Sequence, residues 1–121
     1  MLTFNEAIKI LGSKQQKKIA NNTVLSKTNS DTLLMIKLHG YAIIFITKGG
    51  AKGLDHSYDM YSLHSCGYKT VTTKRRLNKY GPVSVYQKDF IWYTEHGKFV
   101  DGQMFKANGD LIGNVYDSVS K

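Results

Sequence analysis

Apolar residues near the N-terminus recur at the spacing of one helix face. The stripe consists of Phe4, Ala7, Ile8 and Leu11. Thr3 and Glu6 precede and open it in the arrangement of a capping box, in which each side chain accepts a hydrogen bond from the other residue's backbone amide. Gly12 follows the last apolar position and is suited to a helix end. The pattern therefore predicts a helix that begins at Thr3.

A second polar pattern of the same kind spans residues 13–16 and precedes a basic stretch. We interpret it as a short exposed helix that runs to Ala20, with Ile19 and Ala20 as its only apolar residues. The Asn-Asn-Thr segment at 21–23 ends it, because asparagine tolerates the left-handed backbone conformation. Together the two patterns predict a helical section over residues 3–22.

The rest of the chain is rich in β-branched and apolar runs separated by turn residues. These runs cover residues 33–38, 41–46, 58–63, 83–88 and 90–94, followed by shorter apolar segments around Asn108-Gly109. His39-Gly40 separates the first two runs, and Asn108-Gly109 is a preferred hairpin turn. The first two runs are apolar almost throughout, so a further layer has to cover them.

These patterns predict a single α+β domain over residues 1–121. Its strand-rich section, residues 32–113, forms a mostly antiparallel β-meander covered by the N-terminal helical section. A short basic helix over residues 72–80 is inserted between strands. The length is sufficient to bury a core without disulfides or a metal, and 41% hydrophobic residues are incompatible with a disordered chain.

The charge balance points to an anionic partner. Seventeen Lys and Arg residues against nine Asp and Glu residues give a formal net charge of +8, which favours nucleic acid as a partner over a neutral surface. The alternative is that this charge only keeps the protein in solution. Cys66 is the single cysteine, which indicates a reducing compartment. We find no export signal and no apolar run of membrane-spanning length, so we expect a cytoplasmic protein without membrane contact.

The stretch 65–82 is the most specialised part of the chain. A helix that begins at Thr72 or Thr73 places Leu77 and Tyr80 on one face, with cations on the opposite arc. Backbone amides at its start, beside threonine hydroxyls, are equipped to hold a phosphate. The candidate nucleic-acid or anion-binding residues are Lys69, Thr70, Thr72, Thr73, Lys74, Arg75, Arg76 and Lys79. The alternative is that the threonines only cap the helix and the cations only face water.

Aromatic residues surround this basic stretch. Tyr68 and Trp92 are the candidates for stacking on bases, provided that their rings are exposed. Tyr86, Phe90 and Tyr93 belong to the same aromatic group. The alternative for each of these residues is that its ring packs in the core, as aromatic residues in strands more often do.

No complete catalytic or metal-binding signature is present. His39, His64, Cys66 and His96 match no zinc-finger spacing, so we expect no metal and no cofactor. Two of His39, His64 and His96 could act as acid and base in a metal-free ribonuclease, although the sequence favours a non-enzymatic role. Cys66 is more typical of a buried small side chain than of a nucleophile.

Several segments resemble a family of small bacteriophage proteins. The similar segments are Asn21-Asn22-Thr23-x-Leu25, Leu38-His39 and Ser65-x-Gly67-x-x-Thr70-Val71-Thr72-Thr73-Lys74-x-Arg76-Leu77-Asn78. In that family the central segment reads Gly-Gly-Trp-Arg-Thr-Val-Thr-Thr-Lys, so Cys66, Tyr68 and Lys69 are departures. The resemblance implies a phage accessory protein that acts in the host cytoplasm, in replication, takeover of the host or evasion of its defences.

Charge and resemblance together predict a small phage protein that binds nucleic acid, or a host complex carrying nucleic acid, through the basic helix. The alternative is a protein-to-protein inhibitor of a host defence system, such as an anti-CRISPR protein, whose cationic face meets an acidic partner. A metal-free ribonuclease is the third candidate. The sequence leaves the oligomeric state and the choice between DNA and RNA open.

Overall fold

The computed structural model describes residues 1–50 and 57–117. Within these residues the chain forms two helices, α1 (Phe4–Leu11) and α2 (Val71–Tyr80), and ten strands. The strands are β1 (Gln16–Ala20), β2 (Thr23–Lys27), β3 (Leu33–Leu38), β4 (Tyr41–Thr47), β5 (Met60–Leu63), β6 (Tyr86–Lys88), β7 (Ile91–Thr94), β8 (Gly97–Lys98), β9 (Gln103–Lys106) and β10 (Leu111–Asn114).

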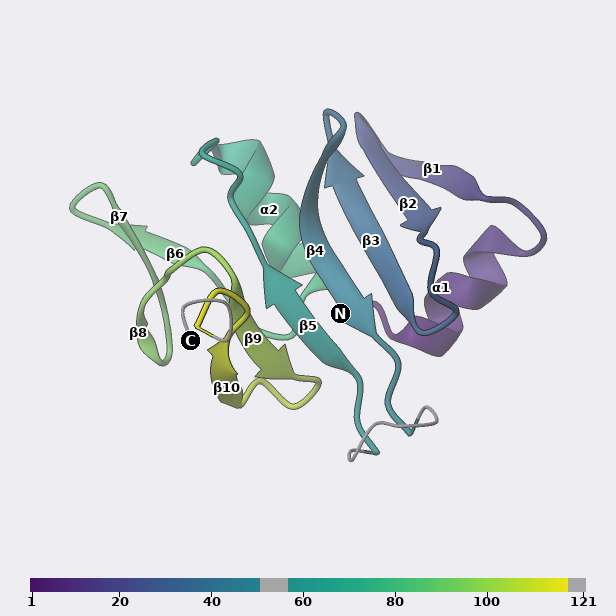
Figure 1. The fold of residues 1–121 in the computed structure, drawn as a ribbon. Coiled ribbons are helices and arrows are strands. Elements are labelled where there is room, and N and C mark those ends of the chain that lie inside the picture. Colours follow the sequence, from purple (N-terminus) through teal and green to yellow (C-terminus); the bar gives the residue numbers. More distant parts are fainter. Residues whose placement is uncertain (51–56, 118–121) are drawn as a thin grey trace.

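The strands belong to two antiparallel sheets (Figure 1). The large sheet has seven strands in the order β1-β2-β3-β4-β5-β9-β10, and the small sheet has three in the order β6-β7-β8. Strands β1 to β5 are neighbours in both sequence and space, which is a meander. Helix α2 and the small sheet are inserted between β5 and β9, which pair directly with each other. The predicted α+β class with a mostly antiparallel sheet is therefore confirmed.

Both helices cover the same face of the large sheet. Register aligns Leu25 with Ile36, Ile36 with Ile44 and Ile44 with Leu63, and all four side chains are fully buried. Helix α1 contacts β1 and β2, whereas α2 contacts β4 and lies behind it in Figure 1. In β3 and β4 the alternating residues Leu33, Met35 and Phe45 face away from the helices and are only partly buried. The core therefore lies between the sheet and the helices.

Helix α1 begins as the sequence predicts. The Glu6 amide donates to Thr3 Oγ1 at 3.2 Å, and the Thr3 amide donates to Glu6 Oε1 at 2.9 Å. Hydrogen bonding to the Glu6 carboxylate by the Thr3 backbone, and secondarily by the Thr3 side chain, lowers the pKa of this carboxyl. The Asp59 carboxylate, far away in the sequence, accepts the Phe4 amide at 2.9 Å. Ile8 is the exception in the predicted stripe, since it is exposed.

The predicted helix over residues 14–20 is wrong, so the helical section ends at Leu11 and not at residue 22. Gly12, at a φ of 57°, turns the chain back, and residues 16–20 form β1 at the edge of the large sheet. The physical reason is that this basic segment has too little apolar surface to dock a helix. An edge strand needs only the backbone pairing that β2 supplies. Asn22 does have a left-handed φ, of 54°, but it lies in the β1–β2 turn.

The remaining predicted strands are present with shifted ends. The His39-Gly40 turn joins β3 to β4, and β9 pairs with β10 across the Asn108-Gly109 region. The turn between β6 and β7 consists of Asp89 and Phe90, so Phe90 belongs to the turn and not to a strand over residues 90–94. Residues 83–85 precede β6 and are not in a strand.

Candidate anion-binding face of helix α2

Helix α2 is capped by a threonine and docked by one apolar face. Thr70 Oγ1 accepts the Thr73 amide at 3.1 Å, so the helix begins at Val71, earlier than the sequence predicted. Thr73, Leu77 and Tyr80 are the buried residues of the helix, in agreement with the prediction for the last two. Thr73 is only 1% exposed and its hydroxyl lies 3.0 Å from that of Thr70. Thr73 therefore belongs to the core and the cap and does not present a hydroxyl to an anion.

The loop before α2 is held by Asp101. Its carboxylate accepts the Ser65 amide at 2.8 Å and the Ser65 hydroxyl at 2.9 Å. Cys66 follows with a left-handed φ of 55°, and its thiol donates to the carbonyl of Ala42 at 3.1 Å. Burial, and secondarily the Asp101 charge, raises the pKa of the Cys66 thiol. A protonated, partly buried thiol agrees with the packing role predicted for this cysteine.

Five cations gather on and before the helix, and we call them the α2 cationic face. They are Lys69, Lys74, Arg75, Arg76 and Lys79. Lys69, Arg75 and Lys79 are exposed, and Lys74 is partly buried. In the part of the chain that the structure describes, the only ion pair is between Glu95 and His96. None of the five cations therefore has a carboxylate partner there, so their charge remains available to an anionic ligand.

Two polar residues of α2 are occupied by structural contacts. Arg76 Nε donates to Thr23 Oγ1 at 2.8 Å and its Nη2 donates to the Asn21 carbonyl at 3.4 Å, which ties the helix to the β1–β2 turn. The Asn78 side chain exchanges two hydrogen bonds with the Val85 backbone, at 3.0 and 2.6 Å. Arg76 therefore contributes charge but has limited freedom, and Asn78 holds the segment after α2 in place.

A pocket of about 470 Å³ opens beside the start of α2, and we call it the α2-start pocket. Its lining comes from the β3–β4 hairpin, the loop before α2 and the first turn of the helix: Leu38, His39, Tyr41, Ile43, Ser65, Cys66, Tyr68, Thr70, Thr72 and Thr73. Tyr41 and Tyr68 are both about half exposed, their ring centroids are 5.0 Å apart, and the Tyr68 hydroxyl donates to that of Tyr41 at 3.3 Å. This hydrogen bond raises the pKa of Tyr68.

The structure brings together Tyr68, Thr70 and Thr72 from the predicted binding set, and adds His39 and Tyr41, which lie outside that set. The signal that could have found Tyr41 is its place directly after the predicted His39-Gly40 turn. That turn lies beside the start of α2 only through tertiary contacts, which no local pattern encodes.

Trp92 is not a stacking residue. Its side chain is 2% exposed and packs against Phe99, with ring centroids 6.2 Å apart. Trp92 and Thr94 point into the core from β7, because alternate residues of a strand face opposite sides. A base cannot reach this ring without unfolding the small sheet, so Tyr68 alone remains from the predicted stacking pair.

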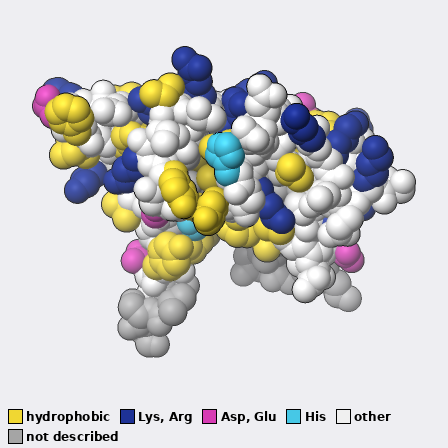
Figure 2. Space-filling model, turned by 90° about the horizontal axis from the view of Figure 1, so that it is seen from above, with side chains coloured by type: hydrophobic (Ala, Val, Ile, Leu, Met, Phe, Trp, Pro, Cys, Tyr) yellow, Lys and Arg dark blue, Asp and Glu magenta, His cyan; other side chains and the backbone are white. Residues whose placement is uncertain are grey.

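Figure 2 views the molecule from the end that carries the β3–β4 turn and the start of α2. Lys and Arg side chains are spread over this face, with few Asp or Glu side chains between them (Figure 2). Hydrophobic side chains lie among the cations near the middle of the view. A mixed surface of this kind suits a ligand that has both phosphates and flat apolar groups.

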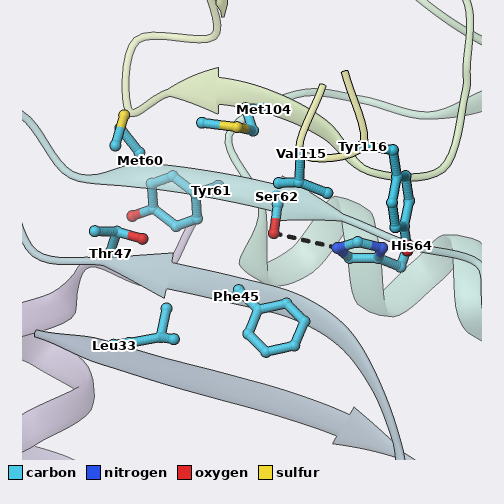
Figure 3. A pocket seen from close by; sticks show the side chains of 10 residues that line it. All are labelled: Leu33, Phe45, Thr47, Met60, Tyr61, Ser62, His64, Met104, Val115 and Tyr116. Atoms are coloured by element: carbon cyan, nitrogen blue, oxygen red, sulfur yellow. Dashed lines mark hydrogen bonds between the residues drawn. The ribbon is translucent and has the colours of Figure 1, made fainter. Parts of the chain in front are cut away.

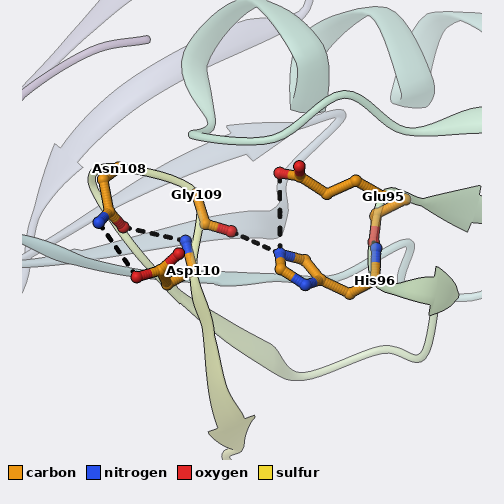
Figure 4. Close-up of polar contacts among 6 residues, drawn as sticks. Glu95, His96, Asn108, Gly109 and Asp110 are labelled. Atoms are coloured by element: carbon orange, nitrogen blue, oxygen red, sulfur yellow. Dashed lines mark hydrogen bonds and ion pairs between the residues drawn. The ribbon is translucent and has the colours of Figure 1, made fainter.

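The described histidines lie in three different places. His39 lines the α2-start pocket. His64 lines a second pocket, of about 340 Å³, on the sheet face away from the helices, and is 3.2 Å from Ser62 Oγ (Figure 3). His96 Nε2 is 2.7 Å from the Gly109 carbonyl and 3.7 Å from Glu95 (Figure 4). No contact joins any two of them, so the structure gives the ribonuclease alternative no acid–base pair among His39, His64 and His96.

His64 should make stability depend on pH. Burial lowers the pKa of its imidazole below the ordinary value of 6.5, against a smaller opposing effect of Asp101. The unfolded chain then binds a proton more readily than the folded one, so the free energy of unfolding falls as the pH drops below about 6.5 towards the lowered pKa. We expect chemical denaturation at pH 5 and pH 8 to differ less for His64→Gln than for the wild type. Equal differences for the two proteins would show that His64 does not carry this effect.

These features describe a small α+β protein. The cations of one helix face have no carboxylate partner among the described residues, and a pocket lined in part by two tyrosines lies beside them. Over residues 3–112 the chain matches the family model described as Kyanoviridae Gp96 protein, so it belongs to this family of phage proteins. The expectation of a phage protein family is therefore confirmed. No curated protein and no solved structure matches the chain. Among the described residues, neither helix has the length and apolar character needed to cross a membrane, and no group of three or more metal-ligating side chains is present.

Proposed function

We propose that this phage protein binds nucleic acid, or a host complex that carries nucleic acid, through the α2 cationic face, and that it does so in the host cytoplasm without catalysing a reaction. The observation that carries the proposal is the absence of carboxylate partners for all five cations within the described residues. Five cations within the eleven positions from Lys69 to Lys79 concentrate this charge in one place. Phosphates would supply the missing counter-charge.

The start of α2 adds donors to this charge. The amides of Val71 and Thr72 have no hydrogen-bond partner among the described residues, because Thr70 satisfies only the Thr73 amide. Lys69 and the Thr72 side chain are exposed next to them. A phosphate at this position would gain amide and hydroxyl donors together with the favourable end of the helix dipole. The half-exposed ring of Tyr68 is available for a base next to that phosphate.

The second candidate is inhibition of a host defence protein through the same surface. It is favoured by the apolar part of the α2-start pocket, which Leu38 and Ile43 line together with the two tyrosines. An acidic partner protein with a protruding apolar side chain would fit such a pocket and the surrounding cations. Nucleic acid is preferred because the cations extend along the helix well beyond the pocket, from Lys69 to Lys79.

Fluorescence anisotropy with labelled 20-nucleotide single-stranded RNA, single-stranded DNA and duplex DNA at low salt tests the proposal. We expect at least one of these ligands to bind with a dissociation constant of roughly 1 µM or tighter, since non-specific complexes reach about 1–100 µM even at physiological salt. Unlabelled heparin, a non-nucleic polyanion, should compete. Failure to bind any of the three ligands at low salt would reject nucleic-acid binding and favour the protein partner.

A further inference from the structure

The small sheet has one buried and one open face. Trp92 and Thr94 of β7 are buried and face the core. The register pairs Tyr86 with Tyr93, Tyr93 with Lys98 and Lys88 with Ile91. Because side chains alternate along a strand, these five residues share the other face. We call Tyr86, Lys88, Ile91, Tyr93 and Lys98 the small-sheet platform.

The platform combines stacked rings with unpaired cations. The rings of Tyr86 and Tyr93 lie 5.9 Å apart at an interplanar angle of 25°, and Tyr86 is 51% exposed. Lys88 on β6 and Lys98 on β8 are exposed and have no carboxylate partner in the described part of the chain. Lysines beside exposed aromatic faces are the equipment with which sheets bind unpaired bases and the phosphates between them.

Phe90 lies at the end of this platform. Its side chain is exposed, and its backbone has an unfavourable conformation. It lies in the β6–β7 turn, which Figure 1 places at the edge of the molecule away from the large sheet. Its side chain is 91% exposed and its φ is 67°, a conformation that bulky residues rarely adopt. Glycine is the preferred residue at this position of a two-residue hairpin turn. No contact within the described residues explains a phenylalanine there, whereas contact with a ligand would.

The platform continues towards α2. A hollow of about 680 Å³ is lined by both Tyr86 of the platform and Asn78 near the end of α2, together with Ser84 and Glu95. Lys79 follows Asn78 directly and belongs to the α2 cationic face. A strand of nucleic acid could therefore pass from the platform to the helix without leaving the surface. Glu95 and Asp89 are the acidic residues along this route.

We propose that the small-sheet platform, with Phe90 at its end, stacks the unpaired bases of a single-stranded nucleic acid. This inference rests on the proposed function and specifies its ligand. Duplexes are disfavoured because their base faces are already stacked within the helix, whereas single strands offer a face from every base. The α2 cationic face then supplies charge, and the platform supplies the preference for single strands.

The test compares Tyr86→Ala/Phe90→Gly with the wild type in anisotropy titrations against a single-stranded 20-mer of deoxythymidine and a 20-base-pair duplex. We expect the double variant to lose roughly tenfold or more in affinity for the single strand and less than twofold for the duplex. The salt dependence of single-strand binding should be unchanged, because stacking releases no counterions. Tyr86→Phe should retain the wild-type affinity, since it keeps the ring.

Tyr116→Ala is the matched control, because Tyr116 is an exposed tyrosine that contacts His64 instead of the platform. Thermal melting checks the fold, and Phe90→Gly alone should not lower the melting temperature because glycine is unstrained at this φ. If the wild type binds single strands but the double variant binds them equally well, the platform is rejected and the proposed function stands. If the wild type binds no nucleic acid at low salt, both are rejected.

Discussion

Replacing Arg75 and Lys79 together by glutamate is expected to weaken nucleic-acid binding about a hundredfold at low salt, roughly tenfold for each reversed charge. The two residues are four positions apart, so their side chains are neighbours on the exposed side of α2. Neither has a carboxylate partner among the described residues, so the change breaks no ion pair there. The Lys79 ammonium group lies over the ring of Tyr80, 5.5 Å from its centroid, and this contact is lost in the variant.

The control is Lys14→Glu/Lys17→Glu, which changes the net charge by the same amount at the start of β1. We expect it to lower the affinity less than fivefold, through the long-range field alone. Both double variants alter exposed side chains, so their melting temperatures should remain close to that of the wild type. A larger loss of binding in the β1 variant than in the α2 variant would place the site on the edge strand.

Asp101→Ala is expected to destabilise the fold by about 3 kcal/mol, or roughly 10 °C in melting temperature. The Asp101 carboxylate is the acceptor for both the amide and the hydroxyl of Ser65, which is 1% exposed. Alanine leaves two buried donors without a partner, which costs more than losing the bonds alone. Because Ser65 begins the loop that leads to α2, the α2-start pocket should lose its shape as well.

Asp101→Asn is the matched comparison, because it keeps one carbonyl oxygen as an acceptor and should cost less than half as much. Chemical denaturation measures both free energies of unfolding. Hydrogen exchange at the amides of residues 65–73 should increase more for the alanine variant than exchange in β3 and β4. Unchanged stability of Asp101→Ala would mean that water replaces the carboxylate and that the loop is held by other contacts.

Local patterns in the sequence were sufficient for much of the fold. The capping box at Thr3 and Glu6 and the Asn108-Gly109 turn were found because their signals involve residues at most three positions apart. The docking face of α2 was found because Leu77 and Tyr80 are the only large apolar residues after its first turn. Patterns of this kind predict the helix, strand or turn to which a residue belongs. At these positions the tertiary structure keeps the element that the local pattern predicts.

The wrong predictions concern residues whose structure is decided by contacts between distant segments. The segment 14–20 has a helix-start signal, yet pairing with β2 decides its structure. Thr73 and Trp92 were predicted in the binding set from their neighbours in sequence, but both side chains face the core. Tyr41 is absent from the predicted set because its contact with Tyr68 forms only when the start of β4 meets the loop before α2. Tyr86 and Tyr93 are in the predicted aromatic group, but their shared face exists only once β6 pairs with β7.

The salt dependence of binding tests the central claim most directly. In four residues of the α2 cationic face the charged side-chain group makes no hydrogen bond to a described residue, unlike that of Arg76: Lys69, Lys74, Arg75 and Lys79. If each neutralises one phosphate of a single strand, the logarithm of the association constant should fall linearly with the logarithm of the salt concentration, with a slope of about −3. In Arg75→Glu/Lys79→Glu the slope should shrink to about half or less. A wild-type slope near zero, or a slope that the variant leaves unchanged, would contradict binding through this face.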